Sequence, residues 1–348
     1  MVFPASADFR LDRALLRRRF NRAARVDVDE ADFLAREIAR RMDERLDYIR
    51  IAPRRVLDLG CGTGSDLERF GERYPAAARL GMDFAESMLA RAHARFTPRH
   101  SDLRGLRRLF GQGGGKNGAS IQLAAADAAR LPLADASVSL VWSNLMLPAI
   151  DDPLPVFREI HRVLDVGGLV MFSTLGPDTL RELREALPSH AGERVHRFID
   201  MHDLGDALLR AGFTDPVMDM EMVTLTYASL DELFTDLRST GFNNAALARP
   251  HGLSGRNAWA AARARYERLR RDGRLPVSVE IIQGHAWKSG ADCGAKPGTR
   301  PDGGSVVHFH PRGADGDRNG RAPETSLLVD QFINERAKRP PGNGRNPE

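Results

Sequence analysis

A short apolar run that ends in three closely spaced glycines limits the possible folds of this chain more than any other feature. The segment Val56–Gly64 reads Val-Leu-Asp-Leu-Gly-Cys-Gly-Thr-Gly. Glycine is needed where a chain turns sharply and a ligand approaches the backbone with no Cβ in the way. The apolar residues predict a buried parallel strand, and the segment after the glycines predicts a helix whose first amides point at the ligand. We therefore expect a strand–loop–helix unit that binds a small molecule.

Strand-like and helix-like segments alternate through the first half of the chain. The predicted strands lie at residues 54–59, 79–83, 121–125, 138–143 and 169–174. The predicted helices lie at residues 28–50, 65–74, 85–96 and 153–165. Such alternation indicates a parallel sheet with right-handed crossovers. The predicted fold class is therefore α/β, a Rossmann-like sheet.

The pattern changes after residue 174, and this change divides the chain into four predicted segments. Helices are expected at 176–188, 200–212, 229–240 and 254–272, and strands at 217–227 and 277–287. We expect residues 1–50 to form a helical N-terminal lid and residues 51–175 to form the core, with a glycine-rich surface insertion near 97–119. Residues 176–288 would form a second lid with the closing strands. Residues 289–348 contain few large apolar side chains and are predicted to be disordered.

Charge is unevenly distributed along the chain. The net charge is only +4, from 51 basic and 47 acidic residues. Residues 1–25, however, hold seven arginines against two aspartates, a local excess of +5. This segment either attracts an acidic partner or is a solvated, frayed N-terminus. We expect no nucleic-acid partner.

The cysteine count and the length of the apolar runs indicate the cellular compartment that we expect for this chain. Cys61 and Cys293 lie far apart and match no metal-ligand spacing, which predicts a reduced, cytoplasmic protein with neither disulfide nor metal site. No run reaches the ~18 uninterrupted apolar residues of a membrane span, so no membrane partner is expected.

An acidic residue follows the glycine loop at a distance typical of a carboxylate that binds ribose. Asp83 ends the second predicted strand 19 residues after Gly64, close to the offset of about 20 residues for a carboxylate that binds ribose hydroxyls. The loop spacing, Gly60-x-Gly62-x-Gly64 after Asp58, differs from the G-x-G-x-x-G of NAD-binding loops. It resembles motif I of class I S-adenosylmethionine-dependent methyltransferases.

The resemblance extends over about residues 50–175 and implies S-adenosylmethionine as cofactor. Residues 125–132 are similar to the family segment whose aspartate contacts adenine, and residues 164–173 to the turn into strand five. In this family the motif I acid lies near the amino-acid part of the ligand, and the next acid binds ribose. The candidate cofactor-binding residues are Asp58, Gly60, Gly62, Gly64, Asp83, Asp127, Ser143 and Asn144.

Three further segments narrow the methyltransferase type. Residues 20–25, 141–145 and 196–198 resemble the malonyl-acyl-carrier-protein O-methyltransferases of biotin synthesis. That resemblance spans roughly residues 20–288 and implies methylation of the free carboxylate of malonyl-acyl carrier protein or malonyl-CoA. Such a carboxylate is ionised at pH 7 and needs no general base. Arg197 would hold it through its planar donor fork, or alternatively forms a surface ion pair.

Two observations leave the substrate open. Leu147-Pro148 stands where this family commonly has a Gln-Trp or His-Trp pair, so an aromatic wall of the substrate pocket is expected to be missing. Residues 176–183 and 202–205 also resemble a mitochondrial complex I assembly factor of the same superfamily, which acts on or binds a protein arginine. That group tends to lack an arginine at the position of Arg197, so this residue discriminates between the two.

Overall fold

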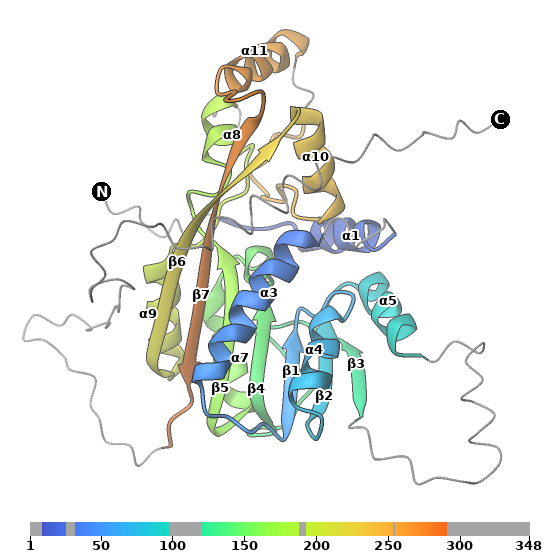
Figure 1. Cartoon of the computed structure of the whole chain (residues 1–348), viewed down its shortest axis with the longest axis vertical. Helices are drawn as coiled ribbons and strands as arrows, with labels where there is room; N and C mark the ends of the chain where they lie inside the picture. Colours follow the sequence, from blue (N-terminus) through green and yellow to red (C-terminus); the bar gives the residue numbers. More distant parts are fainter. Residues whose placement is uncertain (1–8, 26–31, 98–119, 188–192, 253–254, 291–348) are drawn as a thin grey trace, which may run out of the picture.

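A single mixed sheet of seven strands forms the centre of the molecule (Figure 1). The computed structural model describes residues 9–25, 32–97, 120–187, 193–252 and 255–290. The strands are β1 (Arg55–Leu59), β2 (Ala78–Asp83), β3 (Ile121–Ala125), β4 (Val138–Asn144), β5 (Leu164–Leu175), β6 (Thr214–Tyr227) and β7 (Leu275–Trp287). Their order in the sheet is β3-β2-β1-β4-β5-β7-β6. The predicted α/β, Rossmann-like class is confirmed.

The sheet is not parallel throughout, and here the sequence-based expectation was incomplete. Strands β1 to β5 are parallel, whereas β7 pairs antiparallel with both β5 and β6. β7 is antiparallel to β6 because the chain forms helices beyond the end of β6 and then returns along β6 as β7, without a crossover. β7 is thereby inserted between β5 and β6.

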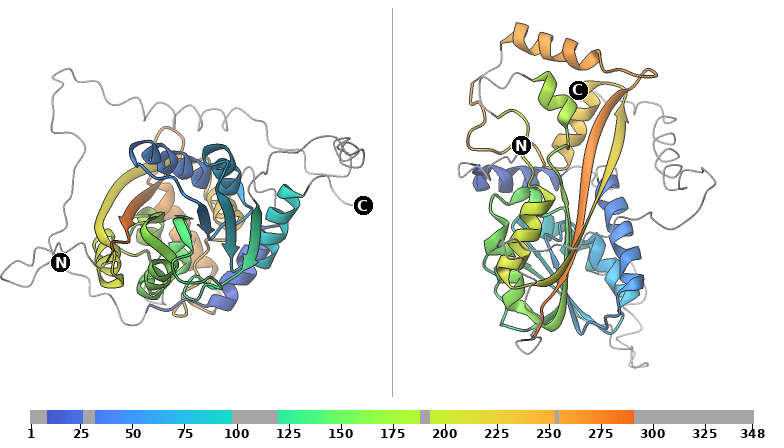
Figure 2. Two further views of the ribbon diagram at one scale, coloured as in Figure 1. Left: turned by 90° about the horizontal axis from the view of Figure 1, so that it is seen from below. Right: turned by 90° about the vertical axis from the view of Figure 1, so that its left-hand side faces the viewer.

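Most helices begin and end within two residues of the predicted positions, but those predicted at 28–50, 176–188 and 254–272 are shorter than expected, and the helix at 13–23 was not predicted as a separate element. The helices are α1 (Arg13–Ala23), α3 (Phe33–Arg45), α4 (Ser65–Arg73), α5 (Glu86–Phe96), α7 (Pro153–Val163), α8 (Arg181–Ala186), α9 (Met201–Ala211), α10 (Leu230–Ser239) and α11 (Arg256–Glu267). Two 3-10 turns add η1 (Leu46–Tyr48) and η2 (Leu147–Ala149). Helices α3 and α4 cover one face of the sheet, and α7 and α9 cover the other (Figure 2).

Alternation along the strands builds one hydrophobic core on each face. In β5, Met171 faces the core that contains α3, whereas its neighbour Phe172 faces the core that contains α7 and α9. In β4, Trp142 likewise faces the core that contains α3, and Val141 faces the core that contains α7 and α9. Successive strand side chains point to opposite faces, so a sheet covered on both sides needs apolar residues at consecutive positions. This two-sided burial holds the carboxyl ends of β1, β2 and β4 in a fixed arrangement.

The arginine-rich N-terminal segment forms an ordered helix, so the frayed alternative is wrong for residues 13–23. The Asp12 side chain caps α1 by accepting a hydrogen bond from the Leu15 amide at 2.9 Å. Leu16 and Ala23 are buried. The helix contacts α5 and α10 and lies across the carboxyl end of the sheet (Figure 1).

The ends of β6 and β7 extend past strands β1–β5, and α8, α10 and α11 lie around these ends (Figure 1). β6 and β7 belong to the same sheet as β1–β5. The division of the chain into four segments stays a prediction. The glycine-rich insertion and nearly all of the predicted tail lie outside the described residues. Within the described part, no helix is long and apolar enough to span a membrane.

Candidate functional site

The glycine loop after β1 adopts backbone angles that other residues rarely take. Gly60, Gly62 and Gly64 have φ values of +81°, +52° and +81°. A Cβ on Gly60 would lie 2.6 Å from the Met146 Cβ, and one on Gly64 would lie 2.8 Å from the Phe96 ring. These two glycines therefore allow close packing within the protein.

Gly62 differs from its two neighbours in the loop. A Cβ placed on it meets no protein atom within 4 Å, so its free side faces open space in the pocket. This opening is the place where the loop backbone is accessible to a ligand.

Asp83 at the end of β2 ties the loop to the neighbouring strand. Its Oδ2 accepts a hydrogen bond from the Gly62 amide at 2.9 Å, and its Oδ1 accepts one from the Ala85 amide at 2.8 Å. Burial raises the pKa of this carboxyl above its usual range, although the hydrogen bonds oppose the shift. Asp83 lines both pockets described below, as its predicted ribose-binding role requires.

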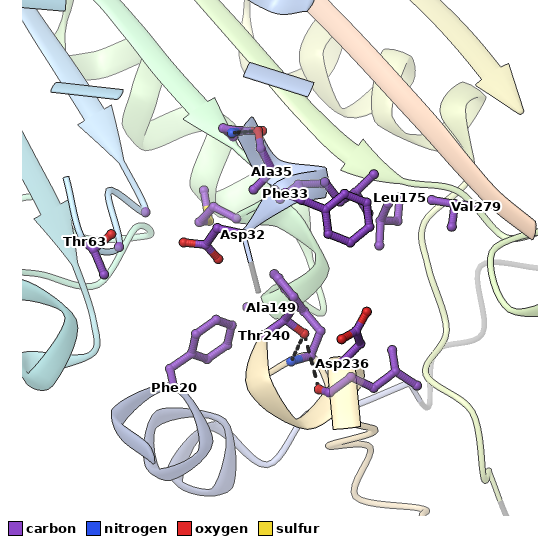
Figure 3. A pocket seen from close by; sticks show the side chains of 18 of the residues that line it. Phe20, Asp32, Phe33, Ala35, Thr63, Ala149, Leu175, Asp236, Thr240 and Val279 are labelled. Carbon is purple, nitrogen blue, oxygen red and sulfur yellow. Dashed lines mark hydrogen bonds between the residues drawn. The ribbon is translucent and has the colours of Figure 1, made fainter. Parts of the chain in front are cut away.

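A central pocket begins at this loop and runs between α3, α10 and the far ends of β6 and β7 (Figure 3). Asp58 and Gly62 line its inner end, and Leu175 and Val279 line the end toward the lid. Most of its remaining wall is apolar, with the aromatic side chains of Phe20, Phe33, Phe84, Phe198, Tyr227 and Phe242. The aromatic wall expected to be missing at Leu147-Pro148 is thus supplied by other elements.

Leu147 and Pro148 have a structural role instead. Both are buried in the turn η2, and neither lines a pocket. The Pro148 carbonyl lies 2.8 Å from Nε2 of the buried His196. Burial is the main cause that lowers the pKa of His196 to about 4, so the ring is neutral at pH 7 and donates this hydrogen bond.

A side pocket opens on the other side of the Asp83 carboxylate. Asp83 and Phe84 at the end of β2 line it, together with residues 125–128 at the end of β3 and the first half of α1. Asp127 is half-exposed and forms a bidentate ion pair with Arg13 of α1, with N–O distances of 3.0 and 3.2 Å. The predicted adenine-contacting residue therefore lies at the expected pocket but is bound to the N-terminal helix.

The two candidates at the end of β4 are placed differently. Asn144 lines the central pocket, and its amide nitrogen donates to the Ala35 carbonyl at 2.9 Å while its oxygen accepts from Ser173 at 2.8 Å. Ser143 is buried, lines neither pocket, and its hydroxyl has no hydrogen-bond partner among the described residues. Asn144 positions the strand end, whereas the structure shows no ligand-facing role for Ser143.

Arg197 is not brought to the site. Its guanidinium pairs with Glu193 at 2.6 Å, its side chain is 51% exposed, and it lines neither pocket. Its role in substrate binding stays a prediction that this geometry does not favour.

All the charged side chains that line the central pocket among the described residues are acidic. Among the described residues that line it, none is Lys, Arg or His, and the carboxylates are Asp32, Asp58, Asp66, Asp83 and Asp236. Asp58 is fully buried, and its Oδ2 has no hydrogen-bond partner in the described part of the chain. Asp66 cannot be recognised as a pocket residue from the sequence, because a polar residue in the first turn of a helix is ordinarily solvent-exposed.

These features fit S-adenosylmethionine. The open side of Gly62, the unpaired Asp58 oxygen and an acidic lining suit a ligand that carries positive charge, and the side pocket has room for a base beside Asp83. When bound, this cofactor supplies an activated methyl group. Asp58, Gly62 and Asp83 are the residues that would hold it.

Comparison with known proteins agrees with this assignment. A family model described as a methyltransferase domain matches residues 57–172. The malonyl-acyl-carrier-protein O-methyltransferase of Laribacter hongkongensis is 45% identical over 309 residues, which cover 87% of this chain and 97% of that protein. The relative of the same name from Nitrosospira multiformis is 45% identical over 283 residues, covering 81% of this chain and 91% of that protein.

A third relative with this name, from Methylovorus sp., is 45% identical and covers 87% of this chain and 96% of its own length. None of these relatives supports the assembly-factor alternative. The predicted enzyme class and cofactor are confirmed. The chain belongs to the malonyl-acyl-carrier-protein O-methyltransferase family of class I S-adenosylmethionine-dependent methyltransferases.

Proposed function

We propose that this enzyme methylates the free carboxylate of a malonyl group carried as a thioester on acyl carrier protein. The observation that carries the proposal is the course of the central pocket. It connects the cofactor loop at Gly62 with a largely apolar chamber formed by Leu225, Leu237 and Val279 of the lid. An acyl thioester that enters through the lid would present its far end to the methyl group.

The protein's own contribution is binding, orientation and exclusion of water. A malonyl carboxylate has a reference pKa near 4, so it is ionised at pH 7 and no proton has to be removed. The pocket accordingly needs no general base, and none of its described lining residues is a histidine or lysine. Phe33, Leu175 and Val279 would keep water from the reacting groups, and alignment of nucleophile and methyl group supplies most of the acceleration.

The outer surface of α1 supports a protein-bound substrate over a free one. Arg18, Arg22 and Arg25 are exposed, and their spacing of four and three residues places them on one side of the helix and its end. The same helix contributes Phe20 to the wall of the central pocket. An acidic carrier domain docked on these arginines would lie close to the pocket, and the charges would speed its association.

A methyl-transfer assay tests the proposal. Purified protein is incubated with labelled S-adenosylmethionine and with malonyl-acyl carrier protein, malonyl-CoA or succinyl-acyl carrier protein. We expect the malonyl carrier protein to gain the mass of one methylene group and to react faster than malonyl-CoA. Equal rates with CoA would reject the carrier as the preferred partner. Label on a protein arginine, with both malonyl thioesters unmodified, would reject carboxyl methylation.

A further inference from the structure

A leucine in a strained backbone conformation lies in the wall of the central pocket. Leu180 comes directly before α8, and its φ of +60° and ψ of +28° place it in the left-handed region. A branched side chain at such angles costs free energy that glycine would not cost. Leu180 is nevertheless only 7% exposed and lines the pocket together with Leu175 and Val279. Strained residues persist only where their surroundings hold them, and they cluster at functional sites.

A second residue of this kind lies at the opposite end of the pocket. Among the described residues that line the central pocket, the non-glycine residues with positive φ are Leu145 and Leu180. Leu145 precedes Met146, which packs against Gly60, so it belongs to the end that carries the glycine loop. Leu180 packs in the same core cluster as Leu225 of the apolar chamber. The strain at Leu180 therefore concerns the chamber and not the loop.

Strand β7 holds the backbone before, at and after Leu180. The Leu180 amide donates a hydrogen bond to the Ser278 carbonyl at 2.8 Å. The Thr179 hydroxyl accepts one from the Glu280 amide at 3.0 Å and donates one to the Glu280 carbonyl at 3.2 Å. After Leu180, the Glu182 carboxylate accepts hydrogen bonds from the Ser278 amide at 2.9 Å and from the Ser278 hydroxyl. These bonds fix Leu180 against the strand that forms part of the chamber.

The residues between β5 and Leu180 are attached equally firmly. A Cβ on Gly176 would lie 2.3 Å from the carboxyl carbon of Glu280, so only glycine allows this close packing. The Asp178 amide donates to the same carboxylate at 2.7 Å. From α8, the Arg184 guanidinium donates to two backbone carbonyls of the segment at 2.9 and 3.1 Å. The strained conformation of Leu180 is thus imposed from both sides.

We propose that Leu180 limits the length of the acyl group that the enzyme accepts, and that β7 positions its side chain. Glycine would serve the turn alone better, so the leucine side chain has a role beyond the turn. When the substrate carboxylate points toward the glycine loop, an additional methylene group has to fit into the chamber, against a wall that is held too firmly to move. The proposal rests on carboxyl methylation of an acyl thioester and adds the residue that selects among such substrates.

The preference for acyl length tests this role. Leu180→Gly removes the side chain and suits the backbone angles, so the fold should be kept. Methyl transfer to malonyl- and succinyl-acyl carrier protein is compared in the native protein and the variant. We expect the ratio of kcat/KM for the succinyl over the malonyl substrate to rise about tenfold or more, because one methylene group in a fitted pocket is worth about 10- to 200-fold.

Two further variants separate the wall from a general loss of packing. Leu180→Ala removes most of the same side chain but keeps the strained angles, so it should shift the ratio in the same direction and unfold at a lower temperature than Leu180→Gly. The matched control is Leu183→Ala in α8, since Leu183 is 6% exposed and lines neither pocket. This control should lower stability and leave the ratio unchanged.

Binding of uncharged acyl ligands gives a second readout that requires no methyl transfer. Butyryl-, hexanoyl- and octanoyl-pantetheine are titrated calorimetrically into the protein in the presence of S-adenosylhomocysteine. In Leu180→Gly, affinity should continue to rise by about fourfold per buried methylene group at chain lengths where the native protein gains nothing more. A ratio and a chain-length series that both match the native protein, or equal changes in Leu183→Ala, would overturn the role of Leu180. A native protein that methylates no malonyl thioester would instead reject the proposed function, and the binding series would still test the wall.

Discussion

The Gly62 amide donates a hydrogen bond to the Asp83 carboxylate across 2.9 Å, which joins the loop after β1 to the end of β2. The residue predicted to bind ribose thus also holds in place the glycine loop that is predicted to bind the cofactor. A carboxylate oxygen accepts more than one hydrogen bond, so both roles are compatible.

The Asp83→Ala variant should therefore weaken cofactor binding in two ways, by loss of the ribose acceptor and by loosening of the loop. We expect affinity for S-adenosylhomocysteine to fall about ten- to hundredfold, measured by calorimetric titration. Unchanged affinity would remove Asp83 from the cofactor site.

Replacing Gly62 by valine should abolish cofactor binding, because the new side chain would occupy the open space that faces the pocket. Backbone strain at positive φ alone also costs stability, so a control is needed. Gly273→Val supplies it, since Gly273 has φ +75°, has no atom within 4 Å of its Cβ position and lies outside both pockets. If both variants bind cofactor equally well, the loop assignment fails.

Arg197→Ala should have a small effect if the side chain stays where the structure places it. An exposed ion pair such as Arg197–Glu193 contributes at most about 1 kcal/mol, so kcat/KM for malonyl-acyl carrier protein should change by less than about fivefold. Steady-state kinetics checks this. A loss of two or more powers of ten would mean that Arg197 swings to the substrate carboxylate in the complex.

Charge reversal on α1 should act on the carrier and not on the acyl group. We expect Arg18→Glu with Arg22→Glu to raise KM for malonyl-acyl carrier protein roughly fivefold or more at low salt, with less difference at high salt. KM for malonyl-CoA serves as the internal comparison. Arg158→Glu on the exposed side of α7 is the matched control. An equal response of both substrates would argue against docking on α1.

His196 should make stability depend on pH. Its pKa of about 4 in the folded protein is below the unfolded value of about 6.5, so the unfolded chain binds more protons in between. The free energy of unfolding should fall as pH drops from about 6.5 to 4, by up to about 1.4 kcal/mol per pH unit. Denaturant titrations of His196→Gln should show a shallower slope. His202→Gln, whose side chain is 69% exposed, should match the native protein.

Local sequence was sufficient for the strands and for the cofactor loop. The run Val56–Gly64 encodes buried strand, tight turn and helix start within nine residues, and the structure contains each element within one or two residues of its predicted bounds. Asp58 and Asp83 follow from the same argument, because parallel strands end at one edge of the sheet.

Features that depend on distant contacts were not predictable in this way. Five of the eleven residues of helix α1 are arginine. The helix is ordered by a distant segment: Leu16 packs with Ala245, and Arg19 donates to the Asn243 and Asn244 carbonyls at 2.8 and 2.7 Å. The orientation of Asp66 depends on a distant contact, because the indole nitrogen of Trp142, 76 residues later, donates a hydrogen bond to its carboxylate. The segment around Arg197 indicates a position close to α9 but not the direction of the side chain, which Glu193 determines.

The insertion of β7 between β5 and β6 sets the order in which the molecule assembles. Among the described strands β6 pairs with β7 alone, so this pairing waits until residues 275–287 have been synthesised. Until then the edges of β5 and β6 are open, and Met220 and Met222 are exposed on β6 even in the finished fold. Non-local pairing of this kind folds slowly and exposes intermediates to aggregation. The nascent chain would therefore complete the half that carries the glycine loop first, and the central pocket only once β7 has paired.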